Sequence, residues 1–200
     1  MKGRGRLAWL IPLLLLACPQ PSAACGFHSP DDLAIGRAGL SWSFPKASYV
    51  QGAVSMAMSA GILRLSDRLQ RGDLFGFHRV AAKLQALASR IDGGGTRLKA
   101  PVSIVLIGPM LWSVVAPSPG ALAVRSHTDG PAPGTAVVIT DVPVLAALLT
   151  GDLSSQTAEA ASLIRIYGPA NMVIITRAAL RDAFPDTKRA TSRSGVSLPD

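Results

Sequence analysis

Residues 136–151 read AVVITDVPVLAALLTG and contain a complete strand-to-helix unit. The first five are rich in Val and Ile, which favour a β-strand. Asp141 follows with a side-chain acceptor that can cap a helix, and Pro143 falls in the first turn, where its missing N–H costs little. Gly151 then supplies the residue that most often ends a helix. The stretch predicts a buried strand followed directly by a leucine-rich helix.

Upstream of this unit, the hydrophobic period is that of strands. Segments 102–107, 110–115, 121–127 and 135–140 are rich in Val and Ile and are separated by turns that contain Gly and Pro. We expect them to form an antiparallel meander of four strands. Segments 102–107 and 135–140 carry apolar residues on both faces, so the sheet must be covered twice.

Further upstream, the apolar spacing is helical. Residues 47–70 and 74–91 each carry an apolar stripe, and the short link 71–73 predicts that the two helices fold back as a hairpin. Residues 25–46 read as an extended lead segment in which Trp42 and Phe44 anchor the chain to the body.

Downstream of Gly151 we expect a short helix over 154–161, a fifth strand over 163–167, a helix over 169–184 and a flexible tail over 185–200. The whole predicts an α+β fold. A helical N-terminal hairpin precedes a mainly antiparallel five-stranded sheet covered by helices, all within one domain, residues 47–184.

Composition excludes several classes of protein. With 200 residues and 48% hydrophobic residues, the chain can form a true core. Two Cys exclude a disulfide-dense scaffold and a Cys-based zinc cluster. Glu159 is the sole Glu, and motifs for phosphate loops, paired zinc-binding His and nucleophile elbows are absent. We therefore expect a non-enzymatic protein without a cofactor.

The N-terminus has the pattern of an export signal. Lys2, Arg4 and Arg6 precede an apolar stretch, residues 7–17, that is too short to span a bilayer and has the length of a signal-peptide core. Small residues at 22–24 predict cleavage before Cys25, so residues 1–24 are the expected signal peptide. Removing them lowers the net charge from +8 to +5. We expect export to the periplasm.

Two alternatives concern the cysteines. Residues 15–18, LLAC, resemble the lipobox of bacterial lipoproteins, in which Cys18 would be acylated and would anchor the protein to a membrane. Cys25 and His28 lie three residues apart, and a thiolate with an imidazole can share Cu or Zn, although one such pair is an incomplete site. Nucleic acid is not an expected partner, because the basic residues do not alternate with aromatic ones.

An ordered set of segments resembles a known family. Residues 136–141, 145–151, 156–158 and 163–168 read AVVITD, LAALLTG, QTA and LIRIYG. Residues 110–114, MLWSV, are similar to a Trp-bearing second strand. The set resembles the sterol-carrier-protein type-two family of lipid-binding domains over about residues 74–184. The helix at 47–70 and the N-terminus are additional to that pattern.

The resemblance implies a helix-covered sheet that encloses an apolar tunnel for a sterol or fatty-acyl chain. We therefore hypothesise an exported carrier of an apolar ligand. A second hypothesis is a periplasmic accessory protein with a filled core, which docks on its partner through the helix at 47–70. Besides an apolar small molecule or lipid, the mildly basic mature chain leaves a membrane surface or a protein open as partner. In the carrier hypothesis the ligand-binding residues are Trp112, Leu145, Leu148, Leu149, Ile164, Ile166, Met172 and Ile175.

Overall fold

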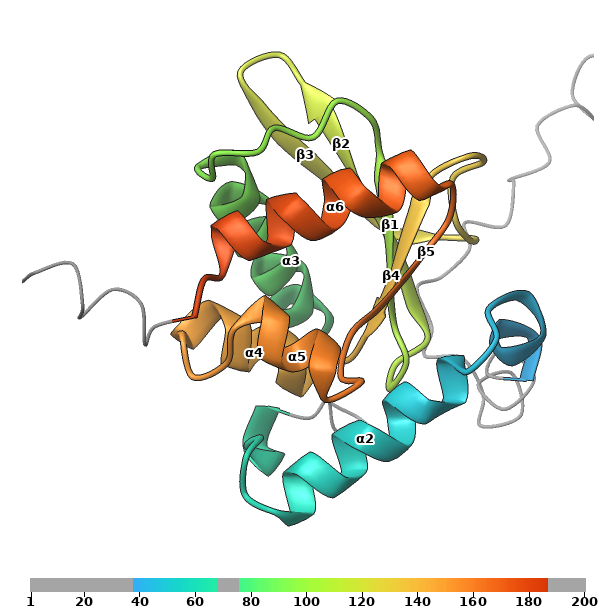
Figure 1. The fold of residues 1–200 in the computed structure, drawn as a ribbon, viewed down its shortest axis with the longest axis vertical. Coiled ribbons are helices and arrows are strands. Elements are labelled where there is room, and N and C mark those ends of the chain that lie inside the picture. Colours follow the sequence, from blue (N-terminus) through green and yellow to red (C-terminus); the bar gives the residue numbers. More distant parts are fainter. Residues whose placement is uncertain (1–37, 68–75, 187–200) are drawn as a thin grey trace, which may run out of the picture.

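A computed structural model describes residues 38–67 and 76–186 (Figure 1). Several predicted features lie outside these residues. They are the signal peptide, the lipidation site Cys18, the metal pair Cys25 and His28, the link 71–73 and most of the C-terminal tail. The elements are α2 (Ala47–Ser59), η2 (Leu65–Asp67), α3 (Gly76–Asp92), β1 (Val102–Leu106), β2 (Leu111–Ser118), β3 (Ala121–Thr128), β4 (Ala136–Thr140), α4 (Val142–Thr150), α5 (Ser155–Ala160), β5 (Arg165–Tyr167) and α6 (Ala170–Ala183).

The fold class is confirmed, because the chain is α+β with a five-stranded, mostly antiparallel sheet. The four-strand meander is wrong at its fourth strand. The strand order is β3-β2-β1-β4-β5, so β4 lies beside β1 and parallel to it, with Val102 opposite Ala136. The other three pairings are antiparallel.

Burial explains where β4 goes. All five residues of β1 and all five of β4 are buried, whereas β3 alternates between exposed and covered positions. A strand that is apolar on both faces is best placed in the middle of a sheet, and a strand with polar alternation is suited to an edge. Pairing β4 with β1 centres the two most apolar strands and leaves β3 at the edge.

The sheet is covered on both faces, as expected from its apolar residues. On one face, Val102, Ile104 and Leu106 of β1 lie against α3, α4 and α6. On the other face, Phe44 packs against the rings of Trp112 and Tyr167, and α2 contacts β4. Both predicted N-terminal helices are therefore present: α3 covers one face of the sheet, and α2 contacts β4.

The predicted extended lead is wrong for its last part, because residues 38–43 are helical. Phe44 is an anchor, as predicted, since it is partly buried against the core. Trp42 is not an anchor, because 89% of its side chain is exposed. Successive residues of a helix turn by about 100°, so Trp42 faces away from the sheet while Leu40 is buried.

The first predicted helix ends eleven residues early, at Ser59 rather than at residue 70. The Ile62 amide donates to the Ala57 carbonyl at 2.9 Å, and the Gly61 amide donates to the Met58 carbonyl at 3.1 Å. This pair of bonds is a Schellman motif, and Gly61 has the positive φ of 72° that the motif requires. The helical spacing of apolar residues continues in the sequence past Gly61, but the helical backbone ends before it.

The C-terminal half follows the predicted boundaries closely. The Asp141 carboxylate accepts the Val142 amide at 2.8 Å at the start of α4, and Gly151 ends that helix with φ 81°. Ser154 caps α5 through the Thr157 amide. The segment after Pro169 is helical, as predicted. No helix in the described ranges is both long and apolar enough to cross a membrane.

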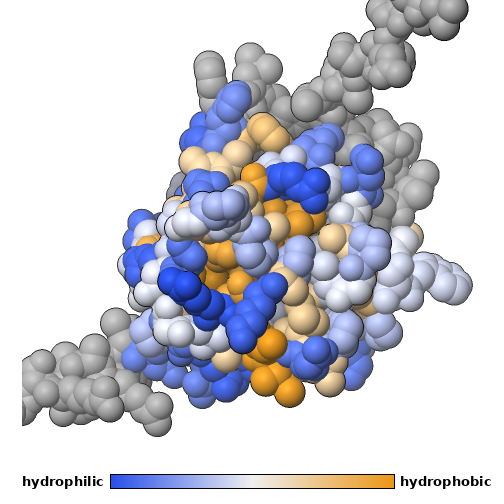
Figure 2. All heavy atoms as spheres, turned by 90° about the horizontal axis from the view of Figure 1, so that it is seen from above, coloured by the Kyte–Doolittle hydropathy of each residue, from blue (hydrophilic) through white to orange (hydrophobic). Residues whose placement is uncertain are grey.

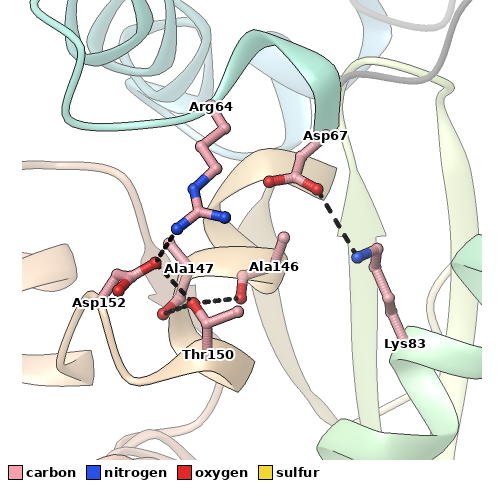
Figure 3. A network of polar contacts seen from close by, with 7 residues as sticks. All are labelled: Arg64, Asp67, Lys83, Ala146, Ala147, Thr150 and Asp152. Carbon is pink, nitrogen blue, oxygen red and sulfur yellow. Dashed lines mark hydrogen bonds and ion pairs between the residues drawn. The ribbon is translucent and has the colours of Figure 1, made fainter.

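Polar contacts fasten the segment after α2 to the helical face (Figure 3). Arg64 lies 3.4 Å from the Asp152 carboxylate, which also accepts the Thr150 hydroxyl at 2.9 Å. Lys83 of α3 lies 3.8 Å from Asp67. These groups are largely or partly exposed, so each pair contributes little to stability and mainly fixes the path of the chain.

Candidate functional site

An apolar cavity of about 20 Å³ lies between the sheet and helices α3, α4 and α6. Leu145 and Leu148 of α4 and Ile164 before β5 line it, together with residues of β1, α3 and α6. The structure thus brings together three of the eight predicted ligand-binding residues. A volume of this size accommodates about one water-sized group, so the interior is close to filled.

One polar atom on this cavity is unusual. Thr176 of α6 is 3% exposed, and within the described part of the chain its hydroxyl has no hydrogen-bond partner. Thr140, the other polar residue on the cavity, donates to the Leu163 carbonyl at 3.1 Å. An unpaired buried hydroxyl costs about 1–3 kcal/mol relative to a paired one.

The other predicted ligand-binding residues lie elsewhere. Trp112 is on the opposite face of the sheet, with its ring centroid 6.2 Å from that of Phe44. Ile166 lines a small surface hollow with Glu159 and Arg177. The remaining three predicted residues are half-buried and do not line the cavity. They are Leu149 at the end of α4, and Met172 and Ile175 on α6.

Large exposed apolar side chains gather in another place. Five such residues, each between 60% and 89% exposed, lie on one segment of the chain, formed by residues 38–43, α2 and the turns up to and including η2. They are Trp42, Tyr49, Met56, Ile62 and Leu65. Figure 1 shows this segment, in blue to teal, running along one side of the molecule. We call these five residues the α2 surface.

Helix geometry explains how α2 serves both the core and the surface. Ala47, Val50 and Val54 are buried against the sheet, and Ala57 continues the same stripe. Tyr49 and Met56 are seven residues apart, which is about two turns, so both project from the same side of the helix. That side also holds small uncharged residues such as Gly52.

Charge is sparse around the α2 surface. Residues 38–67 contain two basic residues, Lys46 and Arg64, and one acidic residue, Asp67 of η2. Lys46 is exposed at the start of α2, and Arg64 is 69% exposed near its end. Arg64 shares its charge with Asp152 at 3.4 Å.

The second hypothesis names the helix at 47–70 as a docking surface, but the sequence pattern does not identify the exposed residues. Trp42 reads as an anchor, and the helical stripe reads as core. A signal was present in the sequence. Residues 47–63 carry no charged side chain at all, although a surface helix normally presents charged residues to water. A helix that is buried on one side and uncharged on the other indicates a second apolar contact.

Tyr167 and Arg177 have shifted pKa values. Burial raises the pKa of the Tyr167 phenol, and the neighbouring Arg165 opposes the shift. A hydrogen bond to Glu159 raises the pKa of Arg177, whose Nε lies 2.7 Å from the carboxylate.

Metal binding finds no support in the part of the chain that the structure describes. Three or more His, Cys, Asp or Glu side chains do not come together there in a way that could hold an ion. The pair Cys25 and His28 lies outside that part, so it stays a prediction.

A more open hollow of about 220 Å³ lies on the α2 side of the sheet. It is bounded by residues 38–41, the first turns of α2 and Ile107.

Comparison of the chain with protein-family models, with curated proteins and with solved structures gives no match.

Proposed function

We propose that this chain is an exported, non-enzymatic binding protein with a filled core, which acts through the α2 surface. The observation that carries the proposal is the concentration of exposed apolar side chains. Of the six large hydrophobic residues that are exposed in the described ranges, five belong to the α2 surface. Exposed apolar side chains gathered on one segment of a folded protein are typical of an interaction site.

The α2 surface has no evident role in folding. The opposite side of α2 already supplies the residues that cover the sheet, including Ala47 and Val50 at 0% exposure. Exposed side chains away from the core contribute within about 0.5 kcal/mol of stability. Trp42, Tyr49 and Met56 therefore serve binding better than they serve the fold.

The small interior cavity supports the same proposal. A carrier of an acyl chain or sterol needs a continuous apolar space, and the cavity here measures about 20 Å³. Export to the periplasm through residues 1–24, with Cys18 as an acylated anchor in the lipoprotein alternative, forms part of the proposal. Either route places the α2 surface in the cell envelope.

A specific observation favours a second candidate, the carrier of an apolar ligand. The unpaired Thr176 hydroxyl faces an apolar cavity and would gain a hydrogen bond from a ligand with one polar group. Figure 2 shows apolar side chains inside a border of hydrophilic ones on the face seen from above. In this candidate, α6 must move outward to make room.

Native mass spectrometry of the protein purified from its own host tests the proposal. The parent chain is compared with a Trp42→Ser, Tyr49→Ser, Met56→Ser variant. We expect the parent to retain lipid or protein molecules that the variant loses. A third protein, Thr176→Val, tests the carrier candidate. That candidate would be supported if the parent and the triple variant both retain one small apolar molecule and Thr176→Val loses it.

A further inference from the structure

We propose that the partner of the α2 surface is an anionic lipid bilayer, into whose interface the α2 surface inserts. The inference rests on the proposed function and names its partner. Three features of the described residues carry it: the kinds of side chain, the distribution of charge, and the position of α2 on the sheet.

The side chains of the α2 surface suit a membrane interface. Trp42 and Tyr49 each combine a large apolar ring with one polar group, which is the composition that prefers the level of the lipid headgroups. Met56, Ile62 and Leu65 have no polar group and gain most from contact with acyl chains. A bilayer interface receives both kinds of side chain at once.

The charges on the segment also fit anionic lipid. Residues 38–67 hold two basic residues, Lys46 and Arg64, and one acidic residue, Asp67, which lies 3.8 Å from Lys83. Lys46 is exposed just before α2, whereas Arg64, beyond its other end, shares its charge with Asp152. The excess charge near the apolar helix face is therefore positive and small. Long basic side chains can reach lipid phosphates while neighbouring apolar groups insert.

The same charges disfavour a second copy of this chain as the occupant. The chain is positive, with a formal net charge of +8 in full and +5 without residues 1–24, so two copies of it repel each other. A bilayer rich in anionic headgroups has the opposite sign. Charge complementarity therefore favours lipid over self-association.

The position of α2 allows shallow insertion without unfolding. Its inner side is held on the sheet by Val50 and Val54, while Tyr49 and Met56 project away from it. The two projecting side chains are about 10 Å apart along the helix axis. The helix can therefore lie parallel to a membrane and keep its contacts with the core.

Brominated lipid provides a position-specific test in the full chain. Brominated acyl chains quench indoles that enter a bilayer. Trp9 is replaced by Phe in every sample, which leaves Trp42 at 89% exposure and Trp112 packed on the sheet beside Phe44. Vesicles of brominated phosphatidylcholine, with and without phosphatidylglycerol, are titrated into the protein. Quenching of Trp42 reports insertion of this surface even if the N-terminus attaches the chain to the vesicle.

We expect phosphatidylglycerol vesicles to quench the emission, and a Trp42→Phe substitution to abolish the quenched component. Binding should weaken as salt rises. A Tyr49→Ser, Met56→Ser variant should partition at least about tenfold less. Ile174→Ser is the matched control, because Ile174 is 63% exposed but lies on α6, and its substitution should leave partitioning unchanged.

Three results would overturn the inference. The first is that Trp42 is not quenched, and the second is that vesicles without phosphatidylglycerol quench it equally. The third is a blue shift of Trp42 emission that grows with protein concentration in the absence of lipid, which would indicate that a second copy of the chain covers the surface. If quenching is absent but the native protein retains a protein through the α2 surface, the partner is wrong and the proposed function stands. If neither occurs, both are wrong.

Discussion

The Tyr167 hydroxyl donates a hydrogen bond to the carbonyl oxygen of Pro45 at 2.6 Å, across 122 residues of sequence. Tyr167 belongs to the edge strand β5, and its ring lies 5.4 Å from that of Phe44. The contact fastens the chain just before α2 to the sheet. It therefore helps to set the orientation in which α2 presents its outer side.

Replacing Tyr167 by Phe removes this bond and keeps the ring contact. We expect the free energy of unfolding to fall by about 1 kcal/mol at neutral pH, the usual net value of one hydrogen bond. Urea-induced unfolding followed by circular dichroism measures the change. An unaltered midpoint would mean that the bond does not hold the segment.

The same substitution changes the response to alkaline pH. Burial raises the pKa of Tyr167 above its ordinary value of 10.0, so the folded state holds the phenolic proton more tightly than the unfolded state. The associated stability is intact below about pH 10 and is lost as the pH rises through the folded pKa. Stability measured against pH should fall less steeply above pH 10 in Tyr167→Phe than in the parent.

Thr176→Val tests whether the cavity is truly empty. Valine has nearly the same shape as threonine and removes an unpaired buried hydroxyl, so we expect the variant to be about 1 kcal/mol more stable. Thermal unfolding of both proteins gives the comparison. A loss of stability would show that the hydroxyl has a bound partner, as the carrier candidate requires.

Leu148→Trp distinguishes a filled core from a ligand tunnel. Leu148 is 3% exposed on α4, and the adjoining cavity of about 20 Å³ cannot take the extra volume of an indole. We expect a destabilisation of about 1–3 kcal/mol from overpacking. Unchanged stability, measured by urea unfolding, would indicate that space for a ligand exists beside α4.

Asp141→Ala tests the junction between β4 and α4. One oxygen of the Asp141 carboxylate accepts the amides of Val142 at 2.8 Å and Gly108 at 3.2 Å. Its removal should lower the free energy of unfolding by about 1–2 kcal/mol. Asp141→Asn keeps an acceptor oxygen and should lose clearly less. Equal losses in the two variants would mean that charge, and not the cap, is responsible.

The C-terminal half could be predicted from sequence because local chemistry determines it. Asp141, Gly151 and Ser154 act as caps in the structure as they do in the sequence pattern. Their bonds join residues within a few positions of each other. Such local signals do not depend on the tertiary fold, which is why the pattern predicts α4 and α5 correctly.

The strand order and the α2 surface depend on contacts that sequence periodicity does not contain. The placement of β4 beside β1 follows from which strands are buried on both faces, a property of the assembled sheet. Trp42 and Phe44 are two residues apart and are both aromatic, yet Trp42 is exposed and Phe44 is packed. Only the path of residues 38–46 over the sheet separates them.

In the proposed function, the α2 surface makes contact with a partner in the cell envelope. Site-specific photocrosslinking in the host tests it most directly, with a photoreactive residue in place of Met56 and, in a second strain, in place of Ile174. Both positions are exposed and apolar, but only Met56 lies on the α2 surface. We predict crosslinked adducts, with lipid above all, at position 56 and not at position 174. Absence of adducts at position 56, or equal adducts at both positions, would contradict the claim.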